Sequence, residues 1–179
     1  MLIRVNIRTS PAAGLTAQAR AEIFAFCDRA YGEDLREAIR SSQDPIHVFA
    51  TVDDVIVSQA LWITRWLVAE ARAPLRTAYV EAVATDPAYQ GRGFASAVMR
   101  RLLGEVAGFD LEALCPSDDG QLLYSRLGWE TWRGPLSIRR GSELIATPDE
   151  SIMIHRLPGS PPLDLNDPLS AEWRPGELW

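Results

Sequence analysis

The stretch Asp86-Pro87-Ala88-Tyr89-Gln90-Gly91-Arg92-Gly93-Phe94-Ala95-Ser96-Ala97 decides how the chain is interpreted. Asp86-Pro87 ends a run of strand-forming residues, two glycines follow, and a helix-like apolar pattern starts directly after them. Glycine lets a backbone approach a ligand closely, and the free N–H groups of a helix N-terminus attract anions. Arg92 adds a positive charge. The stretch therefore predicts a strand, a phosphate-binding loop and a helix. The alternative is a glycine-rich turn that binds no ligand.

The loop differs from two common nucleotide-binding motifs. It lacks the GxxxxGK[ST] pattern of a Walker A loop, and it does not contain the GxGxxG pattern of a dinucleotide-binding fold. A pyrophosphate remains the anion that this geometry suits best.

Outward from the loop, the hydrophobic pattern predicts an α+β fold with a mixed, mostly antiparallel sheet flanked by helices. The predicted strands are 1–9, 46–52, 55–69, 75–85, 111–114, 129–133, 136–139 and 151–156. The predicted helices are one that begins after Thr16 and others at 34–41, 91–106 and 121–127. Pro and Gly accumulate at 157–162. We therefore expect one domain, 1–157, followed by a C-terminal tail, 158–179.

Composition excludes several classes of protein. The chain has 179 residues, 47% of them apolar and 23% charged, which excludes a disordered chain, a coiled coil and a collagen. The net charge of −6 is opposite to that of most duplex-binding proteins, so no nucleic-acid partner is expected. The two cysteines and two histidines form no cluster with zinc spacing, so no metal is expected. With neither a signal peptide nor a membrane-spanning run apparent, we expect a cytoplasmic protein without a membrane partner.

The loop and several later segments resemble one enzyme family. Gln90-x-x-Gly93-x-Ala95 is similar to the Gln/Arg-x-x-Gly-x-Gly/Ala motif of the GCN5-related N-acetyltransferases. The segment 123–129 resembles that family's "YxxxGF" segment, and the resemblance covers roughly residues 2–156. One branch, the aminoglycoside 2'-N-acetyltransferases, is closer still. The segments similar to this branch are 79–84, 123–129, 132–135, 147–150 and the terminus 172–179.

The resemblance implies that acetyl-CoA is bound along one strand and its following loop. The pyrophosphate would take the backbone N–H groups of the loop, and the pantetheine arm would run like an added strand. An N–H near Val83 would stabilise the oxyanion. The expected cofactor-binding residues are Val83, Ala84, Thr85, Gln90, Gly91, Arg92, Gly93, Phe94 and Ala95.

Two residues are candidates for proton transfer. Glu81 is an acid within an apolar strand, and regular alternation would place it on the same face as Val83, so we interpret it as the general base. Tyr124 is the candidate general acid, because a phenol with a pKa near 10 can give a proton to a departing thiolate. The alternative for Glu81 is a charged residue on a solvent-exposed strand face. The alternative for Tyr124 is a tyrosine that only packs against its neighbours. Cys115 would need a His or Lys partner for a covalent route, and none is recognisable, so we interpret it as structural or pocket-lining.

The resemblance also implies a cationic amino-sugar acceptor. Carboxylates complement the charges and hydroxyls of an aminoglycoside. The expected substrate-binding residues are Asp34, Glu81, Cys115, Asp149, Glu150, Glu177 and Trp179 with its carboxylate, and Asp149 and Glu150 compete for one role. A terminal Trp also suggests that the tail docks rather than frays.

Other functions remain open at this stage. The same chemistry could act on a kasugamycin-like aminocyclitol, another amino sugar or a peptide amine. A non-catalytic acyl-CoA-binding module is a third possibility, disfavoured by the presence of both Glu81 and Tyr124. A homodimer is expected by analogy with the family.

Overall fold

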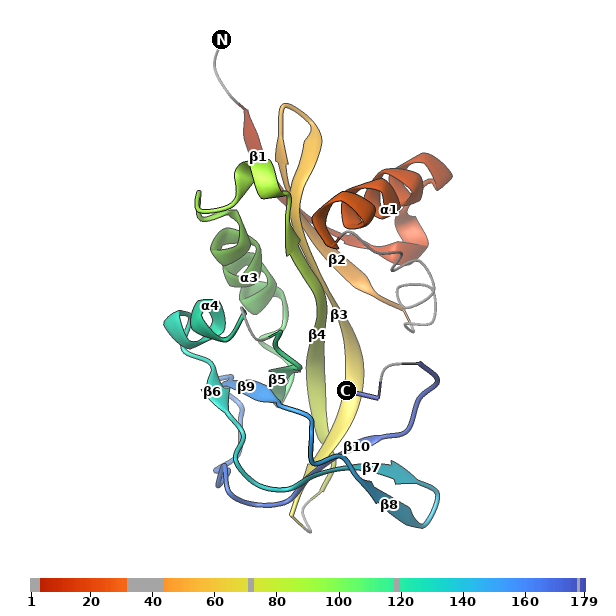
Figure 1. Cartoon of the computed structure of the whole chain (residues 1–179), viewed down its shortest axis with the longest axis vertical. Coiled ribbons are helices and arrows are strands. Elements are labelled where there is room, and N and C mark those ends of the chain that lie inside the picture. The colour runs from red at the N-terminus through yellow and green to blue at the C-terminus, as the bar shows by residue number, and fades with distance from the viewer. Residues whose placement is uncertain (1–3, 32–43, 71–72, 118–119, 177) are drawn as a thin grey trace. The chain divides into compact units, whose positions relative to one another are not determined.

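A computed structural model of the chain describes residues 4–31, 44–70, 73–117, 120–176 and 178–179. These residues form two compact units (Figure 1). The first contains Met1–Ile63 and Val80–Glu105, and the second contains Thr64–Tyr79 and Val106–Trp179. Two long strands, β3 (Val55–Ala69) and β4 (Leu75–Thr85), each contribute residues to both units.

The first unit is built on an antiparallel hairpin. β1 (Val5–Pro11) pairs with β2 (Ile46–Val52), and β2 pairs with the first part of β3. The turn between β2 and β3 consists of Asp53 and Asp54, with φ angles of 49° and 69°. Positive φ at both central residues is the geometry of a two-residue type I′ hairpin, and Asp tolerates it better than most residues.

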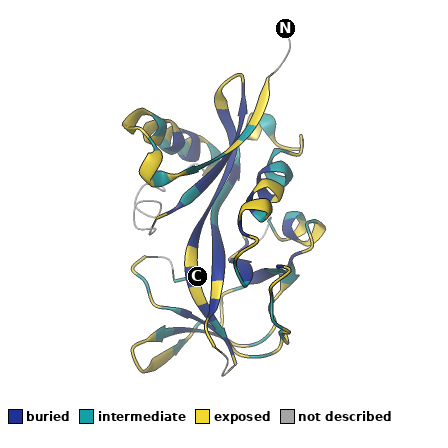
Figure 2. Cartoon of the chain, turned by 180° about the vertical axis from the view of Figure 1, so that it is seen from behind, coloured by how far each residue is buried: buried dark blue, intermediate teal, exposed yellow. Residues whose placement is uncertain are grey.

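Two helices flank the strands of this unit on opposite sides (Figure 1). The side chain of Thr16 caps α1 (Ala17–Tyr31) by accepting a hydrogen bond from the Ala19 N–H at 3.1 Å. α1 buries Ile23, Phe26 and Cys27, which recur at helical spacing. α3 (Phe94–Glu105) packs against β1 and β2. β2 and the first part of β3 are largely buried, whereas β1 and the outer sides of both helices are largely exposed (Figure 2).

The second unit is a mixed set of strands. β5 (Leu111–Leu114) runs parallel to β4 at Thr77–Tyr79, and β9 (Met153–Arg156) runs antiparallel to β5. β10 (Leu169–Glu172) pairs antiparallel with β3 and parallel with β7 (Leu136–Arg140). The short strands β6 (Glu130–Thr131) and β8 (Glu143–Ala146) pair with β9 and β7. α4 (Gln121–Arg126) precedes β6.

The structure confirms the predicted α+β fold with a mixed sheet and corrects several local predictions. The helix expected from residue 91 begins at Phe94, because Gly91 and Gly93 have φ angles of 71° and 82° that do not fit a right-handed helix. The strand expected at 129–133 contains only the two residues of β6. β8 and β10 were not predicted, and β10 lies in the segment taken as a tail. The helix expected at 34–41 lies outside the described residues.

Candidate active site

The C-terminal part of β4 departs from regular strand geometry. The ladder between β4 and β5 covers Thr77–Tyr79, and β4 continues to Thr85. Within this continuation Ala82 has a φ of 50°, which is rare for a residue with a Cβ and is typical of a strained functional site. The regular alternation expected to place Glu81 and Val83 on one face therefore does not hold across Ala82. The role of Glu81 as general base stays a prediction. Glu81 itself is half-buried.

Residues 83–85 are the last part of β4, and the backbone groups from Val83 to Asp86 face two different edges. The N–H of Asp86 donates to Val57 O at 2.9 Å, and Ser58 Oγ donates to Ala84 O at 2.9 Å. Both groups therefore face β3. Because neighbouring residues of a strand direct their backbone groups to opposite edges, Val83 and Thr85 direct theirs away from β3.

The glycine loop has the backbone geometry of an anion site. Gly93 is the residue before α3, and its carbonyl accepts from the Ala97 N–H at 3.0 Å. The first N–H groups of α3 have no partner within the helix, as at every helix start. A Cβ on Gly91 or Gly93 would meet no atom within 4 Å, so space lies open beside the loop. The Arg92 guanidinium lies 5.2 Å from the Tyr89 ring centre. This loop fits a pyrophosphate.

Tyr124 lies in the second unit, on α4. It is 6% exposed, and burial raises the pKa of its phenol to about 12. Its ring contacts Trp129 at 5.9 Å between ring centres, and Trp129 contacts His155 at 5.7 Å. Nδ1 of His155 lies 3.0 Å from a carboxylate oxygen of Glu112, opposite it on β5. Burial raises the pKa of Glu112, and contact with His155 opposes that rise.

Three of the predicted substrate-binding residues are connected within the second unit. The Cys115 thiol lies 3.7 Å from Glu150 Oε2. The Glu150 N–H donates to Thr147 O at 3.3 Å, and Thr147 Oγ1 accepts from the Trp179 indole N–H at 2.8 Å. Asp149 is exposed, and no contact is described for it. Of the two competing acids, Glu150 is the one joined to Cys115. Asp34 and Glu177 lie outside the described residues.

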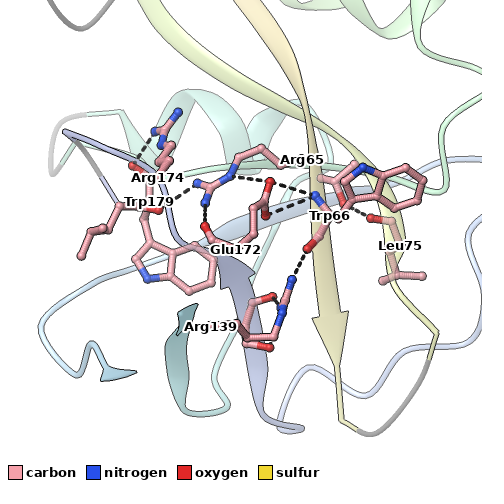
Figure 3. Close-up of polar contacts among 10 residues, drawn as sticks. Arg65, Trp66, Leu75, Arg139, Glu172, Arg174 and Trp179 are labelled. Carbon is pink, nitrogen blue, oxygen red and sulfur yellow. Dashed lines mark hydrogen bonds and ion pairs between the residues drawn. The ribbon is translucent and has the colours of Figure 1, made fainter. Parts of the chain in front are cut away.

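Arg65 is an important residue that the sequence analysis did not assign (Figure 3). It is 1% exposed, and it donates to Leu178 O at 2.9 Å and to Glu172 O at 2.8 Å. Its guanidinium also stacks on Tyr79 at 4.7 Å from the ring centre. The signal in the sequence is a single charge within the apolar run 55–69. Such a charge is buried only with compensating acceptors, and here the C-terminal segment supplies them.

The last residue is docked beside this arginine. Trp179 is 5% exposed, and Arg174 donates to its terminal oxygen at 3.4 Å (Figure 3). This oxygen of Trp179 therefore has a guanidinium donor, which the sequence analysis did not anticipate.

Comparisons with known proteins agree with this geometry. The family model of the Acetyltransferase (GNAT) domain matches residues 7–132. The chain is 31% identical over 139 residues to the aminoglycoside 2'-N-acetyltransferase of Mycolicibacterium fortuitum, covering 75% of this chain and 71% of that protein. The chain belongs to the GNAT acetyltransferase family. It is an N-acetyltransferase with acetyl-CoA as its acyl donor.

Solved structures share the fold of this GNAT chain. The Escherichia coli N-acetyltransferase YhbS in complex with CoA matches with a TM-score of 0.63 and 18% identity, covering 96% of this chain and 91% of that one. Eis1 from Mycobacterium abscessus matches with a TM-score of 0.57 and 23% identity over 75% of this chain. The chain spans about a third of the length of Eis1 and of two further neighbours.

Among the residues that the structure describes, no group of three or more His, Cys, Asp or Glu side chains is placed to hold a metal ion. Within the same ranges, no helix is long and apolar enough to cross a membrane.

Proposed function

We propose that this GNAT chain transfers acetyl from acetyl-CoA to the 2'-amine of an aminoglycoside. The observation that carries the proposal is the 31% identity with an aminoglycoside 2'-N-acetyltransferase over 75% of the chain. The net charge of −6 and the link from Cys115 through Glu150 and Thr147 to Trp179 support a polycationic acceptor. In this proposal Glu150, rather than Asp149, contacts the substrate.

The proposed reaction assigns a role to each group. The loop 90–95 binds the pyrophosphate, and residues 83–85 accept the pantetheine arm along the edge that faces away from β3. Glu81 takes a proton from the acceptor ammonium, directly or through water. The amine nitrogen then bonds to the thioester carbon, whose oxygen becomes an oxyanion stabilised by the Val83 N–H.

The second half of the reaction breaks the C–S bond. The electron pair of that bond leaves with sulfur, and Tyr124 supplies the proton that converts the thiolate to free CoA thiol. Burial raises the pKa of Tyr124 to about 12, so the phenol holds its proton until the thiolate forms. As the C–S bond breaks, the nitrogen loses its second proton to water, which leaves an amide. The products are the amide and CoA, water returns a proton to Tyr124, and the proton held by Glu81 passes to solvent.

A panel of amines tests the acceptor. Release of free CoA thiol is followed with acetyl-CoA and, in separate reactions, an aminoglycoside with a free 2'-amine, the same scaffold carrying a 2'-hydroxyl, kasugamycin and a peptide amine. The proposal expects turnover with the first and at least tenfold less with the second. Equal rates on the matched pair would remove the 2'-amine assignment, and turnover of only the other amines would replace the substrate class.

A further inference from the structure

Two side chains of this chain bind the edge of β4 that faces away from β3. Val83 and Thr85 direct their backbone groups away from β3, toward the edge proposed for the pantetheine arm. The Tyr31 hydroxyl donates to Val83 O at 2.9 Å, and Gln90 Nε2 donates to Thr85 O at 3.3 Å. Both carbonyls on this edge are therefore satisfied before any ligand is added.

Tyr31 is well placed to act at this edge. It is the last residue of α1 and is 37% exposed, so its phenol is not packed into the core. In an extended residue the N–H and C=O point to the same side, so a hydroxyl at Val83 O also lies beside the Val83 N–H. That N–H is the group to which the proposed function assigns the oxyanion.

We propose that Tyr31 is a further catalytic residue, whose hydroxyl is a second hydrogen-bond donor to the thioester oxygen. The proposal rests on the proposed function. Binding of acetyl-CoA exchanges partners at Val83: an amide N–H of the pantetheine arm takes Val83 O, and the released Tyr31 hydroxyl turns to the thioester oxygen. The number of hydrogen bonds is conserved, so the exchange costs little.

The exchange favours the transition state over the bound thioester. The thioester oxygen is neutral in the ground state and gains negative charge as the amine bonds to carbon. Hydrogen bonds to a charged acceptor are roughly twice as strong as those between neutral groups. The Tyr31 hydroxyl therefore stabilises the transition state more than the bound donor, which is the condition for raising kcat.

The side chain that caps the other edge provides a matched control. Ser58 donates to the neighbouring carbonyl, Ala84 O, but on the edge that faces β3. Ser58→Ala and Tyr31→Phe each remove one hydroxyl from a β4 carbonyl, and only Tyr31→Phe removes it from the edge proposed for acetyl-CoA.

Two measurements test the proposal. The first is kcat with the best acceptor of the amine panel, with the CoA Kd from calorimetry. Tyr31→Phe is expected to lower kcat about 10²-fold, the loss typical of one oxyanion donor. Its CoA Kd should be unchanged or lower, because Val83 O no longer has an internal donor. Ser58→Ala should keep wild-type kcat.

The second measurement needs no acceptor, so it remains valid if the proposed substrate fails. Infrared difference spectra of bound acetyl-CoA labelled with ¹³C at the thioester carbonyl report hydrogen bonding to that oxygen. Tyr31→Phe should shift the carbonyl band to higher wavenumber than in the wild type. An unchanged band overturns the proposal. So does an equal loss of kcat in Ser58→Ala, or a Tyr31→Phe defect that resides wholly in the CoA Kd.

Discussion

His47 is a buried imidazole whose protonation should oppose folding. It is 2% exposed and contacts Gln59, whose amide also donates to the Cys27 thiol at 3.0 Å. Burial lowers the pKa of His47 from 6.5 to about 4, and the hydrogen bond with Gln59 offsets part of that change. Burial likewise raises the pKa of the Cys27 thiol to about 12, so all three side chains are uncharged near neutral pH.

We predict an acid-sensitive stability that depends on His47. The unfolded chain binds a proton near pH 6.5, and the folded chain resists it down to about pH 4. Stability from this group is complete above pH 6.5 and falls as pH decreases through that window, by at most about 3 kcal/mol. His47→Gln keeps a polar atom without a charge. Urea unfolding at pH 7.5 and 5 should show a smaller acid loss in the variant, and parallel losses would contradict the prediction.

At Tyr124 we predict a loss of rate without a loss of binding. Tyr124→Phe keeps the ring contact with Trp129 and removes the proton, so kcat should fall about 10²-fold while the CoA Kd stays within threefold. Because the pKa of Tyr124 is raised to about 12, the wild-type rate should show no basic limb from this phenol between pH 6 and 9. Leu122→Ala, at a 61% exposed position of α4, is the control. Near-wild-type kcat in Tyr124→Phe would leave thiolate protonation to solvent.

Among the elements, the loop between β4 and α3 has a conformation that only certain residues tolerate. Gly93 has a φ of 82° and no atom within 4 Å of a Cβ position. A substitution there therefore meets backbone strain and, in the proposed complex, the pyrophosphate. Asp and Asn both tolerate positive φ better than most residues, and they differ in charge. We predict that Gly93→Asp binds CoA at least tenfold more weakly than Gly93→Asn, measured by calorimetry. Equal affinities of the two folded variants would mean that no phosphate approaches this residue.

The longer strands could be predicted from the sequence, and some of the short ones could not. Alternating apolar residues predicted β2, β3, β4 and β5 with their observed bounds, because each lies between residues that favour turns. β8 was missed because it is mostly exposed and has no buried face to produce an apolar pattern, and β10 was missed because it follows a Pro-rich segment. The positive φ of Ala82 could not be predicted, because alanine carries no local preference for it.

In the candidate site, the sequence predicted the local glycine loop but not the contacts between residues far apart in the chain. The loop 90–95 was predicted from its own residues, since glycines before a helix have a direct physical meaning. Arg65 and Tyr31 contact residues far along the chain, Leu178 and Val83, and no local sequence pattern predicts such contacts. Resemblance located Trp179, but only the structure shows Arg174 beside its carboxylate.

Across the whole chain, Arg65 in β3 and the C-terminal residues depend on each other. A buried guanidinium is tolerated because carbonyls of the terminal segment accept its protons, and the terminal indole is buried in turn against Thr147. Deleting the terminal residues leaves a buried cation with fewer acceptors, and removing Arg65 leaves carbonyls without their donor. Each single change therefore includes a penalty that the combined change avoids. The energies of the two changes should therefore not add.

We predict this coupling in a double-mutant cycle. Deleting residues 178–179 should cost several kcal/mol of stability, from the lost burial of Trp179 and the acceptor lost by Arg65. Arg65→Met in the chain without the deletion removes the charge and leaves the carbonyl of Leu178 without its hydrogen-bond donor. The combined variant should be more stable than the sum of the single changes predicts, by about 1 kcal/mol or more. Thermal unfolding of the four proteins measures the cycle.

Two changes at the C-terminus distinguish a role of the Trp179 carboxylate in substrate binding from a purely structural role. Trp179→Phe removes the indole N–H that reaches Thr147 but keeps an aromatic ring and the terminal carboxylate. A short C-terminal extension keeps the indole and moves the carboxylate away. If the carboxylate contacts the acceptor, the extension should raise KM for the aminoglycoside about tenfold, the loss of one charge-assisted hydrogen bond, and leave KM for acetyl-CoA unchanged. Trp179→Phe should change both constants little. An N-terminal extension is the control. An aminoglycoside KM that is equal in both extended enzymes would place the carboxylate outside the acceptor site. Its contact with Arg174 would then be purely structural.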